Sequence, residues 1–260
     1  PPTPAARRLV GRWLERAELL GRRTAELHAC LASGEDFAFR PEPWTPDDGR
    51  AVLRAYRALA DSAFGLLEAR LGSLAGRRAE EARRALALRE RLVSRVAELE
   101  TAAPAAVKVR IHGDLHAGQV LDTGTDFAFI DFEGEPARPV AARRAKRSAL
   151  VDVAGMLRSF HYAAFGGLLR SLGESPPPER WAALAPATRA WYAGVAAAYL
   201  RGYLRAAEGA PFLPASREDL VRLLDAFLVE KATYELAYEL NNRPAWLPIP
   251  LEGLLELAEG

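Results

Sequence analysis

Lysine and long apolar runs are scarce in this sequence of 260 residues, and each scarcity excludes a class of protein. Lysine occurs only at Lys108, Lys146 and Lys231, and the 35 basic residues, mostly arginine, are balanced by 34 acidic ones. A net charge of +1 gives no reason to expect nucleic acid or an anionic membrane surface as a partner. No apolar run approaches the roughly 18 residues of a membrane-spanning helix, so we expect no membrane partner.

Cysteine is represented only by Cys30, which excludes an internal disulfide bond and favours a reducing, cytoplasmic location. The first ten residues, PPTPAARRLV, lack the apolar core of a signal peptide. Half of the residues are hydrophobic, and the length suits one large domain or two small ones.

Apolar residues recur at helical spacing through most of the chain. We expect helices over about 5–32, 45–71, 76–101, 147–172, 179–207 and 217–241, and a short one after Pro250. The segment TPDDG is typical of a helix start, because Thr45 can cap the helix and proline fits its first turn. Ser216 with Asp219 forms a second expected cap.

Short strands are expected in the middle of the chain. VKVRIH (107–112) alternates, and QVLD (119–122) and FAFIDFE (127–133) are joined by the turn TGTD (123–126). The predicted fold class is therefore mainly α, of α+β type, with one small sheet that carries the polar residues discussed next.

Two motifs lie on these strands and the turn between them, HGDLHAGQ (112–119) and IDFE (130–133). Acidic residues in apolar runs are costly to bury without a compensating partner. A carboxylate, a carboxamide five residues later and a second carboxylate occur in the order that phosphoryl transfer uses. Protein kinases carry H-R-D-x-x-x-x-N followed by D-F-G; here glutamine replaces the asparagine, and DFE replaces DFG.

Each of these residues has an expected role. Asp114 would accept or orient the proton of the attacking hydroxyl. Gln119 and Asp131 would be Mg²⁺ ligands through their oxygens, with the metal held against the phosphates of ATP. Glu133, expected on the same strand face as Asp131, could be a further ligand, directly or through water.

The neighbouring polar residues have less specific expectations. His112 is expected to hold the loop, and His116 either contacts substrate or is a plain loop histidine. Asp152 either orients the catalytic loop or faces a helix dipole. A zinc site of His112, His116 and an acid is a weak alternative, because Gly113 disfavours a helix start and the third ligand is undefined. Local capping of backbone groups is the simplest alternative, but the two motifs together favour phosphoryl transfer.

With the surrounding segments, these motifs resemble the maltokinase family. The similar segments are HGDLHAGQVL (112–121), IDFEGEPARP (130–139), RRAKRSALVDVAGMLRSFHYAA (143–164) and VEKATYELAYELNNRPAWLPIPLEGL (229–254). Maltokinases are relatives of aminoglycoside phosphotransferases with a protein-kinase-like fold, and they transfer the ATP γ-phosphate to the anomeric hydroxyl of maltose. The resemblance implies Asp114 as catalytic base, Asp131 as metal ligand, and a link to trehalose synthase and glycogen biosynthesis.

The resemblance also draws attention to the helix expected over 217–241. Its apolar stripe of Leu220, Leu224 and Phe227 continues along one face as Lys231, Tyr234, Glu235, Tyr238 and Asn242. From the residues alone, an exposed helix end with a Lys–Glu pair is the simpler interpretation. The resemblance favours a sugar-binding wall in which the lysine, both tyrosines and the glutamate contact the substrate.

A basic cluster of Arg138, Arg143, Arg144 and Lys146 follows the acidic motif. These side chains could neutralise phosphate, pair with nearby glutamates or be solvated. Arg138 and Arg144 are the candidates for phosphate contact.

The chain lacks the features of an ATP-clasping lobe, since residues 1–106 contain no lysine and no GxGxxG loop. We expect a helical part of a C-terminal lobe over 1–106, a catalytic loop and metal-binding hairpin over 107–135, and a helical substrate-binding part over 136–260. The N-terminal lobe would lie upstream of this sequence or have been removed, and the chain alone would transfer phosphate weakly or not at all.

Two other functions stay open. A kinase of the same fold could act on another acceptor, such as glucosamine or an aminoglycoside, although Lys231 argues against a cationic sugar. A non-catalytic sugar-binding module is also possible, although the retained Asp114, Gln119 and Asp131 argue against it.

Overall fold

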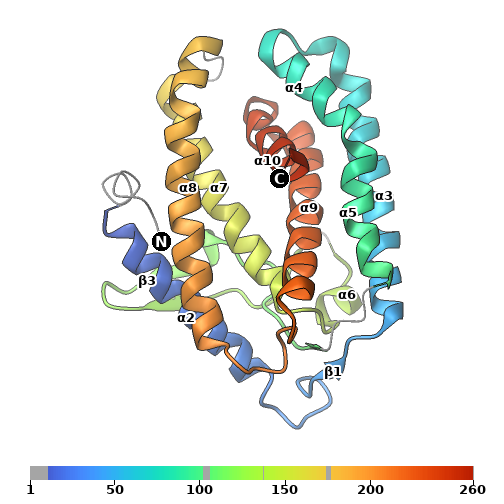
Figure 1. Ribbon diagram of the computed structural model, residues 1–260, viewed down its shortest axis with the longest axis vertical. Coiled ribbons are helices and arrows are strands. Elements are labelled where there is room, and N and C mark those ends of the chain that lie inside the picture. Colours follow the sequence, from blue (N-terminus) through green and yellow to red (C-terminus); the bar gives the residue numbers. More distant parts are fainter. Residues whose placement is uncertain (1–10, 102–105, 137, 174–176, 260) are drawn as a thin grey trace. The chain divides into compact units, whose positions relative to one another are not determined.

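The computed structural model describes residues 11–101, 106–136, 138–173 and 177–259. Within these ranges the protein is mainly helical, with two small antiparallel sheets (Figure 1). The α-helices are α2 (Trp13–Leu31), α3 (Pro46–Arg70), α4 (Gly76–Ala87), α5 (Arg89–Thr101), α6 (Val140–Arg144), α7 (Leu150–Leu172), α8 (Pro178–Ala206), α9 (Arg217–Asn242) and α10 (Pro248–Glu259). The mainly helical fold with a small β component that the sequence predicted is confirmed, while residues 5–10 of the first expected helix lie outside the described residues.

Helix starts follow the expected capping chemistry. At the start of α3, the Thr45 backbone N–H and hydroxyl both donate to Asp48 Oδ2, at 2.8 and 2.7 Å. At the start of α9, the backbone N–H of Asp219 donates to Ser216 Oγ at 3.0 Å. Each arrangement satisfies polar groups that a helix end would leave without an intrahelical partner.

The helix expected over 76–101 is divided at Leu88 into α4 and α5. The two halves pack against different partners, since α4 contacts α10 whereas α5 lies alongside α3 (Figure 1). At Gly49 of α3, an added Cβ would lie 2.1 Å from the backbone oxygen of Leu99 in α5, so these two helices approach closely. One straight helix would not serve both contacts, and hydrophobic periodicity does not reveal that division.

The strands are shorter than expected and form two sheets rather than one. β1 (Glu42–Pro43) pairs with β2 (Val107–Lys108), and β3 (Val120–Asp122) pairs with β4 (Phe127–Phe129), both antiparallel. β1 lies in a segment for which the sequence predicts only a loop. β4 ends before the acidic motif because Asp131 has φ 64°, a left-handed conformation that a strand does not contain.

The chain divides into two compact units, and each unit consists of separate stretches of sequence. Unit 1 comprises described residues within 1–44, 104–160 and 186–220, and unit 2 those within 45–103, 161–185 and 221–260. Leu115, Tyr203 and Phe212 are buried in unit 1, and Phe64 and Phe165 are buried in unit 2. The motifs HGDLHAGQ and IDFE belong to unit 1, and most of α9 belongs to unit 2.

Helices α2 and α8 approach closely inside unit 1 because two glycines lie at their contact. A Cβ on Gly21 would lie 2.0 Å from the backbone oxygen of Tyr199, and a Cβ on Gly202 would lie 2.0 Å from that of Glu18. The guanidinium of Arg201 also donates to Glu18 at 3.1 Å. These contacts fix where α2 lies in unit 1, which is important for the site described below.

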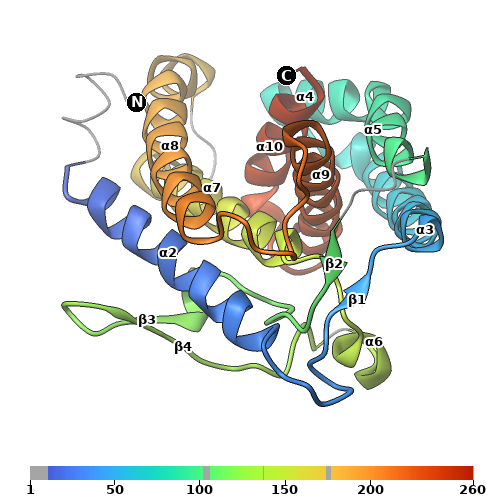
Figure 2. The same cartoon turned by 60° about the horizontal axis from the view of Figure 1, so that its bottom comes forward.

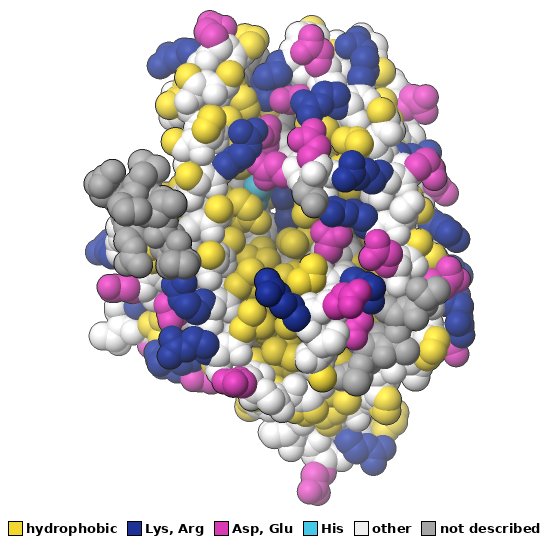
Figure 3. Space-filling view, in the orientation of Figure 1, with side chains coloured by type: hydrophobic (Ala, Val, Ile, Leu, Met, Phe, Trp, Pro, Cys, Tyr) yellow, Lys and Arg dark blue, Asp and Glu magenta, His cyan; other side chains and the backbone are white. Residues whose placement is uncertain are grey.

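Basic and acidic side chains are interspersed over the face of the molecule shown in Figure 3. That distribution agrees with the balanced composition and gives no sign of a large field of one charge on this face. None of the helices in the described ranges combines the length and apolar character needed to cross a bilayer.

Candidate active site

Asp152, in the first turn of α7, holds the turn that carries Asp114. Its Oδ2 accepts the backbone N–H of His112 at 2.8 Å, and its Oδ1 accepts that of Gly113 at 2.9 Å. Gly113 has φ 86°, a conformation that disfavours residues with side chains. Because Asp114 follows directly, the buried carboxylate of Asp152 fixes the backbone just before the candidate catalytic base.

His112 connects the two motifs. Its Nε2 lies 2.8 Å from the carbonyl oxygen of Ile130, and its Nδ1 accepts the N–H of Asp114 at 3.4 Å. Since a carbonyl can only accept, Nε2 carries the ring proton. The ring is buried and lies 4.9 Å from the ring of Phe132. The HGD turn is therefore tied directly to the segment that carries Asp131.

His28 on α2 is a site residue that the sequence reasoning missed. It is fully buried; its Nε2 lies 3.1 Å from Asp152 Oδ2, and its Nδ1 lies 2.9 Å from the hydroxyl of Tyr203. Burial raises the pKa of Asp152, but the hydrogen bonds from His28 and Gly113 outweigh it, so the pKa lies below its ordinary value. The sequence signal is weak, since it is only a histidine at a buried position of an amphipathic helix.

Asp114 and His116 lie next to each other. The Asp114 side chain is 16% exposed, and its Oδ2 is 3.9 Å from His116 Nε2. His116 Nδ1 accepts the N–H of Gly118 at 3.0 Å, and a Cβ on Gly118 would lie 2.7 Å from the imidazole. Gly118 thus leaves room for the His116 ring beside the Asp114 carboxylate. In this position the ring could contact the molecule that accepts the phosphate.

Gln119 and Asp131 meet through their side chains. Gln119 Nε2 donates to Asp131 Oδ2 at 2.9 Å. The backbone carbonyl oxygen of Gln119 accepts the backbone N–H of Ile130 at 3.1 Å. Asp131 is the one non-glycine residue with positive φ among those that the structure describes. Such conformations are concentrated at functional sites.

Glu133 does not share a strand face with Asp131, so that expectation is wrong. The chain has left β4 and turned at Asp131, because its left-handed backbone ends the strand alternation. The side chain of Glu133 is 64% exposed and lies 3.4 Å from Arg143 Nη1. Asp131 is exposed as well. The cost of burying acids, which the sequence suggested, therefore does not arise for these two residues.

The donor chemistry at Gln119 and Asp131 suits a hard cation. No group of three or more His, Cys, Asp or Glu side chains in the described parts of the chain could hold a metal ion. The zinc alternative therefore finds no support there. A carboxylate and a carboxamide both offer hard oxygen ligands of the kind that Mg²⁺ takes, and Mg²⁺ commonly completes its shell with phosphates and water.

Lys146, one member of the expected basic cluster, has a structural role. Its Nζ donates to the carbonyl oxygen of Phe37 at 2.6 Å and to Glu42 Oε1 at 2.7 Å, and its side chain is 6% exposed. The hydrogen bond from Lys146 lowers the pKa of Glu42. This lysine anchors β1 to the segment before α7.

The arginines of the cluster lie beside the acidic motif. Arg143 packs its side chain against Gly134, so that a Cβ there would lie 3.4 Å from Arg143 Cβ, and its guanidinium reaches Glu133. The backbone N–H of Arg138 donates to the carbonyl oxygen of Glu135 at 3.0 Å. Arg144 is exposed in the last turn of α6.

The polar face expected on α9 forms part of unit 2. Lys231 Nζ lies 5.0 Å from the ring centroid of Tyr234, which in turn stacks on Tyr238 with centroids 6.4 Å apart. Tyr238 is 43% exposed, whereas Glu235 is only 8% exposed. A continuous aromatic surface with an acid beside it is therefore present on this helix.

An acid–aromatic cluster at the end of α9 was missed from the sequence. Glu239 is 1% exposed and accepts from the Tyr162 hydroxyl at 3.1 Å and from Arg243 Nη2 at 2.6 Å. Burial raises the pKa of Glu239 despite the arginine. The Arg243 guanidinium lies 4.8 Å from the ring centroid of Trp246. The sequence shows that Glu239 and Arg243 are four residues apart on a helix. It does not show that Tyr162, which is remote in the sequence, is a further partner of Glu239.

Comparisons with known proteins reveal similarity to sugar kinases, although no protein-family model matches the sequence. A glucosamine kinase of Streptacidiphilus jiangxiensis is 28% identical over 243 residues, which cover 93% of this chain and 49% of that protein. A glucosamine kinase of Mycolicibacterium smegmatis is 29% identical over 227 residues, covering 87% and 49%. This chain thus spans about half the length of the curated relatives it matches.

Solved structures agree. One structure of a glucosamine kinase superimposes with a TM-score of 0.74 at 27% identity, covering 98% of this chain and 57% of that one. A glucosamine kinase in complex with glucosamine, ADP and inorganic phosphate gives a TM-score of 0.72 at 26% identity, covering 98% and 59%. The kinase-like fold of these enzymes is therefore shared over almost the entire chain.

The expectation of a maltokinase is wrong. The similar proteins are glucosamine kinases in both comparisons, so the likeness to sugar kinases holds while the assignment to maltose does not. The expected links to trehalose synthase and glycogen biosynthesis depended on that assignment and are withdrawn with it. The motifs do not discriminate between acceptors, because phosphoryl transfer asks for the same kinds of side chain whichever hydroxyl accepts the phosphate.

Proposed function

We propose that this chain forms the catalytic and acceptor-binding part of an ATP-dependent kinase that phosphorylates a hydroxyl of glucosamine. The similarity to glucosamine kinases over at least 87% of the chain supports this proposal most directly. Because those relatives are about twice as long, we propose that an ATP-clasping lobe outside this sequence completes the enzyme.

Asp114 is proposed as the catalytic base. Its carboxylate is mostly buried and next to His116, and Asp152 fixes the backbone immediately before it. A carboxylate in this position can accept the proton of the attacking hydroxyl as the bond to phosphorus forms. The neighbouring imidazole can hold the same hydroxyl in place.

Gln119 and Asp131 are proposed to hold Mg²⁺. The amide nitrogen of Gln119 is directed at Asp131, which leaves its carbonyl oxygen for a cation, and Asp131 is exposed. When bound, the metal would neutralise charge on the nucleotide phosphates. Glu133 is further from this role because its carboxylate pairs with Arg143.

The outer face of the β3–β4 hairpin is proposed to contact the nucleobase. Leu121 and Ile130 are 52% and 38% exposed. Ala128, the cross-strand partner of Leu121, is also exposed. Exposed apolar side chains in a row beside a candidate metal ligand suit the flat face of a nucleobase better than they suit water.

An amino sugar fits α9 better than the sequence suggested. Lys231 argued against a cationic acceptor, but its ammonium lies over the Tyr234 ring, where the π-electrons interact favourably with it. Glu230 precedes Lys231 in the sequence and Glu235 follows it by about one helical turn, so acidic residues lie close to the lysine along α9. We propose that Glu235 attracts the ammonium of glucosamine and that the stacked tyrosines pack against the sugar ring.

The test is an acceptor panel with the full-length gene product, ATP and Mg²⁺, in which phosphorylated sugar is quantified by phosphorus NMR. We expect glucosamine to be phosphorylated with a kcat/KM well above that for glucose or maltose. Turnover of maltose in preference to glucosamine, or of no sugar at all, would contradict the proposal.

A further inference from the structure

His28 connects α2 to the HGD turn through the carboxylate of Asp152. Its Nε2 is 3.1 Å from Asp152 Oδ2, and the two oxygens of Asp152 accept the backbone N–H groups of His112 and Gly113. The other ring nitrogen is held by the Tyr203 hydroxyl at 2.9 Å. With both nitrogens engaged and the ring fully buried, His28 has one orientation, and it transmits the position of α2 to the residue before Asp114.

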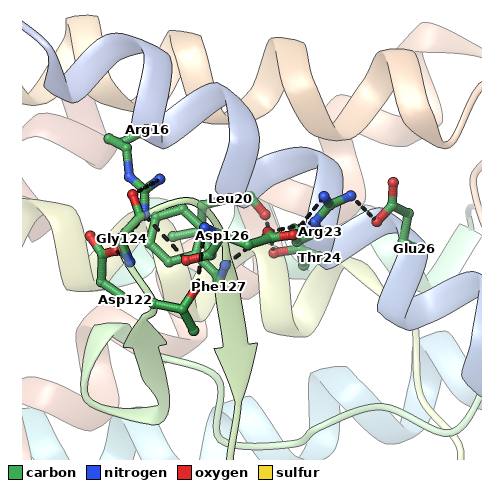
Figure 4. A network of polar contacts seen from close by, with 10 residues as sticks. Arg16, Leu20, Arg23, Thr24, Glu26, Asp122, Gly124, Asp126 and Phe127 are labelled. Carbon is green, nitrogen blue, oxygen red and sulfur yellow. Dashed lines mark hydrogen bonds and ion pairs between the residues drawn. The ribbon is translucent and has the colours of Figure 1, made fainter.

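Arg23, on the same helix, binds the β3–β4 hairpin that leads to Asp131. Its Nε and Nη2 donate to the two carboxylate oxygens of Asp126, each at 2.7 Å (Figure 4). The hydrogen bond from Arg23 lowers the pKa of Asp126 to about 2, so this carboxylate is ionised at neutral pH. A bidentate pair fixes direction as well as distance. Asp126 immediately precedes β4, which ends two residues before Asp131.

Arg16 adds a second contact to the hairpin. Its Nη2 donates to Asp122 Oδ1 at 2.6 Å and to the carbonyl oxygen of Asp126 at 3.3 Å, and its guanidinium lies 4.1 Å from the ring centroid of Phe127 (Figure 4). Figure 2 shows the hairpin running alongside α2. Two arginines two turns apart thus hold both strands.

The two connections start from one rigid element. Helix α2 lies close to α8 because Gly21 has no side chain at their contact. The loops that α2 holds also contact each other, because His112 donates to the carbonyl oxygen of Ile130. Because both connections start from α2, loss of either one would let one segment shift relative to the other.

We propose that α2 sets the relative position of these two segments, with His28 and Arg23 as positioning residues for phosphoryl transfer. The catalytic part of this inference rests on the proposed function, whereas its structural part does not. Neither residue touches the reacting atoms in this account. Their effect on rate comes from the alignment of the base and the metal ligand, to which phosphoryl transfer is sensitive.

The experiment compares His28→Gln and Arg23→Gln with a control variant, Arg12→Gln, in the full-length protein. Arg12 is exposed and lies immediately before α2. Hydrogen–deuterium exchange of peptides covering the HGD turn and the hairpin is measured alongside kcat and KM. Tyr203→Phe is a milder companion variant, because it keeps the buried ring and removes only the hydroxyl that orients His28.

We expect exchange to rise about tenfold in the HGD turn for His28→Gln and in the hairpin for Arg23→Gln. In both variants kcat should fall by up to about a hundredfold while KM for ATP changes little. Tyr203→Phe should act in the direction of His28→Gln, and Arg12→Gln should leave exchange and kcat unchanged. Reversing the pair, Arg23→Asp with Asp126→Arg, should restore part of the lost kcat.

Unchanged exchange in both segments would overturn the inference, and so would raised exchange with an unaltered kcat in an active enzyme. If the wild-type protein phosphorylates no sugar but exchange rises as expected, the proposed function fails while the structural role of α2 is supported. The two failures are therefore distinguishable.

Discussion

Gln119 donates its side-chain amide to Asp131 at 2.9 Å, and this contact joins the two motifs that the sequence places twelve residues apart. It orients the carbonyl oxygen of Gln119 away from its partner. Asp131 makes this contact from a left-handed backbone conformation, with φ 64°. The contact therefore brings together the side chains of the two candidate metal ligands, which come from different loops.

Replacing Gln119 with alanine tests the proposal that Gln119 and Asp131 hold Mg²⁺. Loss of one oxygen donor and of the hydrogen bond that holds Asp131 should raise the Mg²⁺ concentration for half-maximal activity by about ten- to a hundredfold. The measurement is a Mg²⁺ titration of the phosphorylation rate at saturating ATP. Asn241→Ala, an exposed amide of α9, is the control and should leave the titration unchanged. An identical Mg²⁺ requirement in Gln119→Ala would contradict the assignment.

Glu235→Gln tests the amino-sugar site. Removing the charge should raise the KM for glucosamine by about tenfold, because a charge-assisted hydrogen bond is lost. The KM for glucose, which carries no ammonium, should stay the same. Steady-state kinetics with both sugars decide the matter, with Glu218→Gln at the exposed start of α9 as control. An equal rise for both sugars would show that Glu235 does not recognise the amino group.

Gly21→Ala should destabilise the protein by about 1–3 kcal/mol, the usual cost of overpacking. A Cβ there would lie 2.0 Å from a backbone oxygen of α8, which cannot move aside as a flexible side chain could. Gly65→Ala is the matched control, since nothing lies within 4 Å of its Cβ position in α3. That change should stabilise the protein by about 0.5–1 kcal/mol. Chemical denaturation measures both; equal effects would refute the close approach of α2 and α8.

Glu81 makes stability depend on pH. Burial raises its pKa from 4.5 to about 7, although Arg77 opposes the shift. A raised pKa in the folded state means that its contribution is fully present below about pH 4.5 and is lost as pH rises through 7. Between pH 5 and 8 the wild-type protein should therefore lose up to roughly 3 kcal/mol from this group. Glu81→Gln should lack that loss in denaturation curves; parallel pH profiles for the two proteins would contradict it.

The sequence predicted most helices, because caps and hydrophobic periodicity are local signals. It did not predict where the strands end. FAFIDFE alternates as a strand would, and only the left-handed Asp131 reveals the turn. It also missed His28, whose partner Asp152 is far along the chain, since burial of a single histidine has no local signature.

The contacts of the lysine side chains could not be predicted from the sequence. Lys146 was placed with a possible phosphate, yet it bonds Phe37 and Glu42. Lys231 was expected on a sugar-binding face, and its ammonium lies over the Tyr234 ring, a contact that the sequence alone does not specify. In both cases the residue type was informative, but what a long cationic side chain contacts is decided by tertiary structure.

The most direct test of the account is the rate of phosphate transfer to glucosamine by the full-length protein with Asp114→Asn. Without its base, the enzyme should lose about 10²- to 10⁴-fold in kcat, with unchanged thermal stability and ATP binding. Glu35→Gln, an exposed acid of unit 1, should keep the wild-type rate. Asp114→Asn that phosphorylates glucosamine at the wild-type rate would contradict the account.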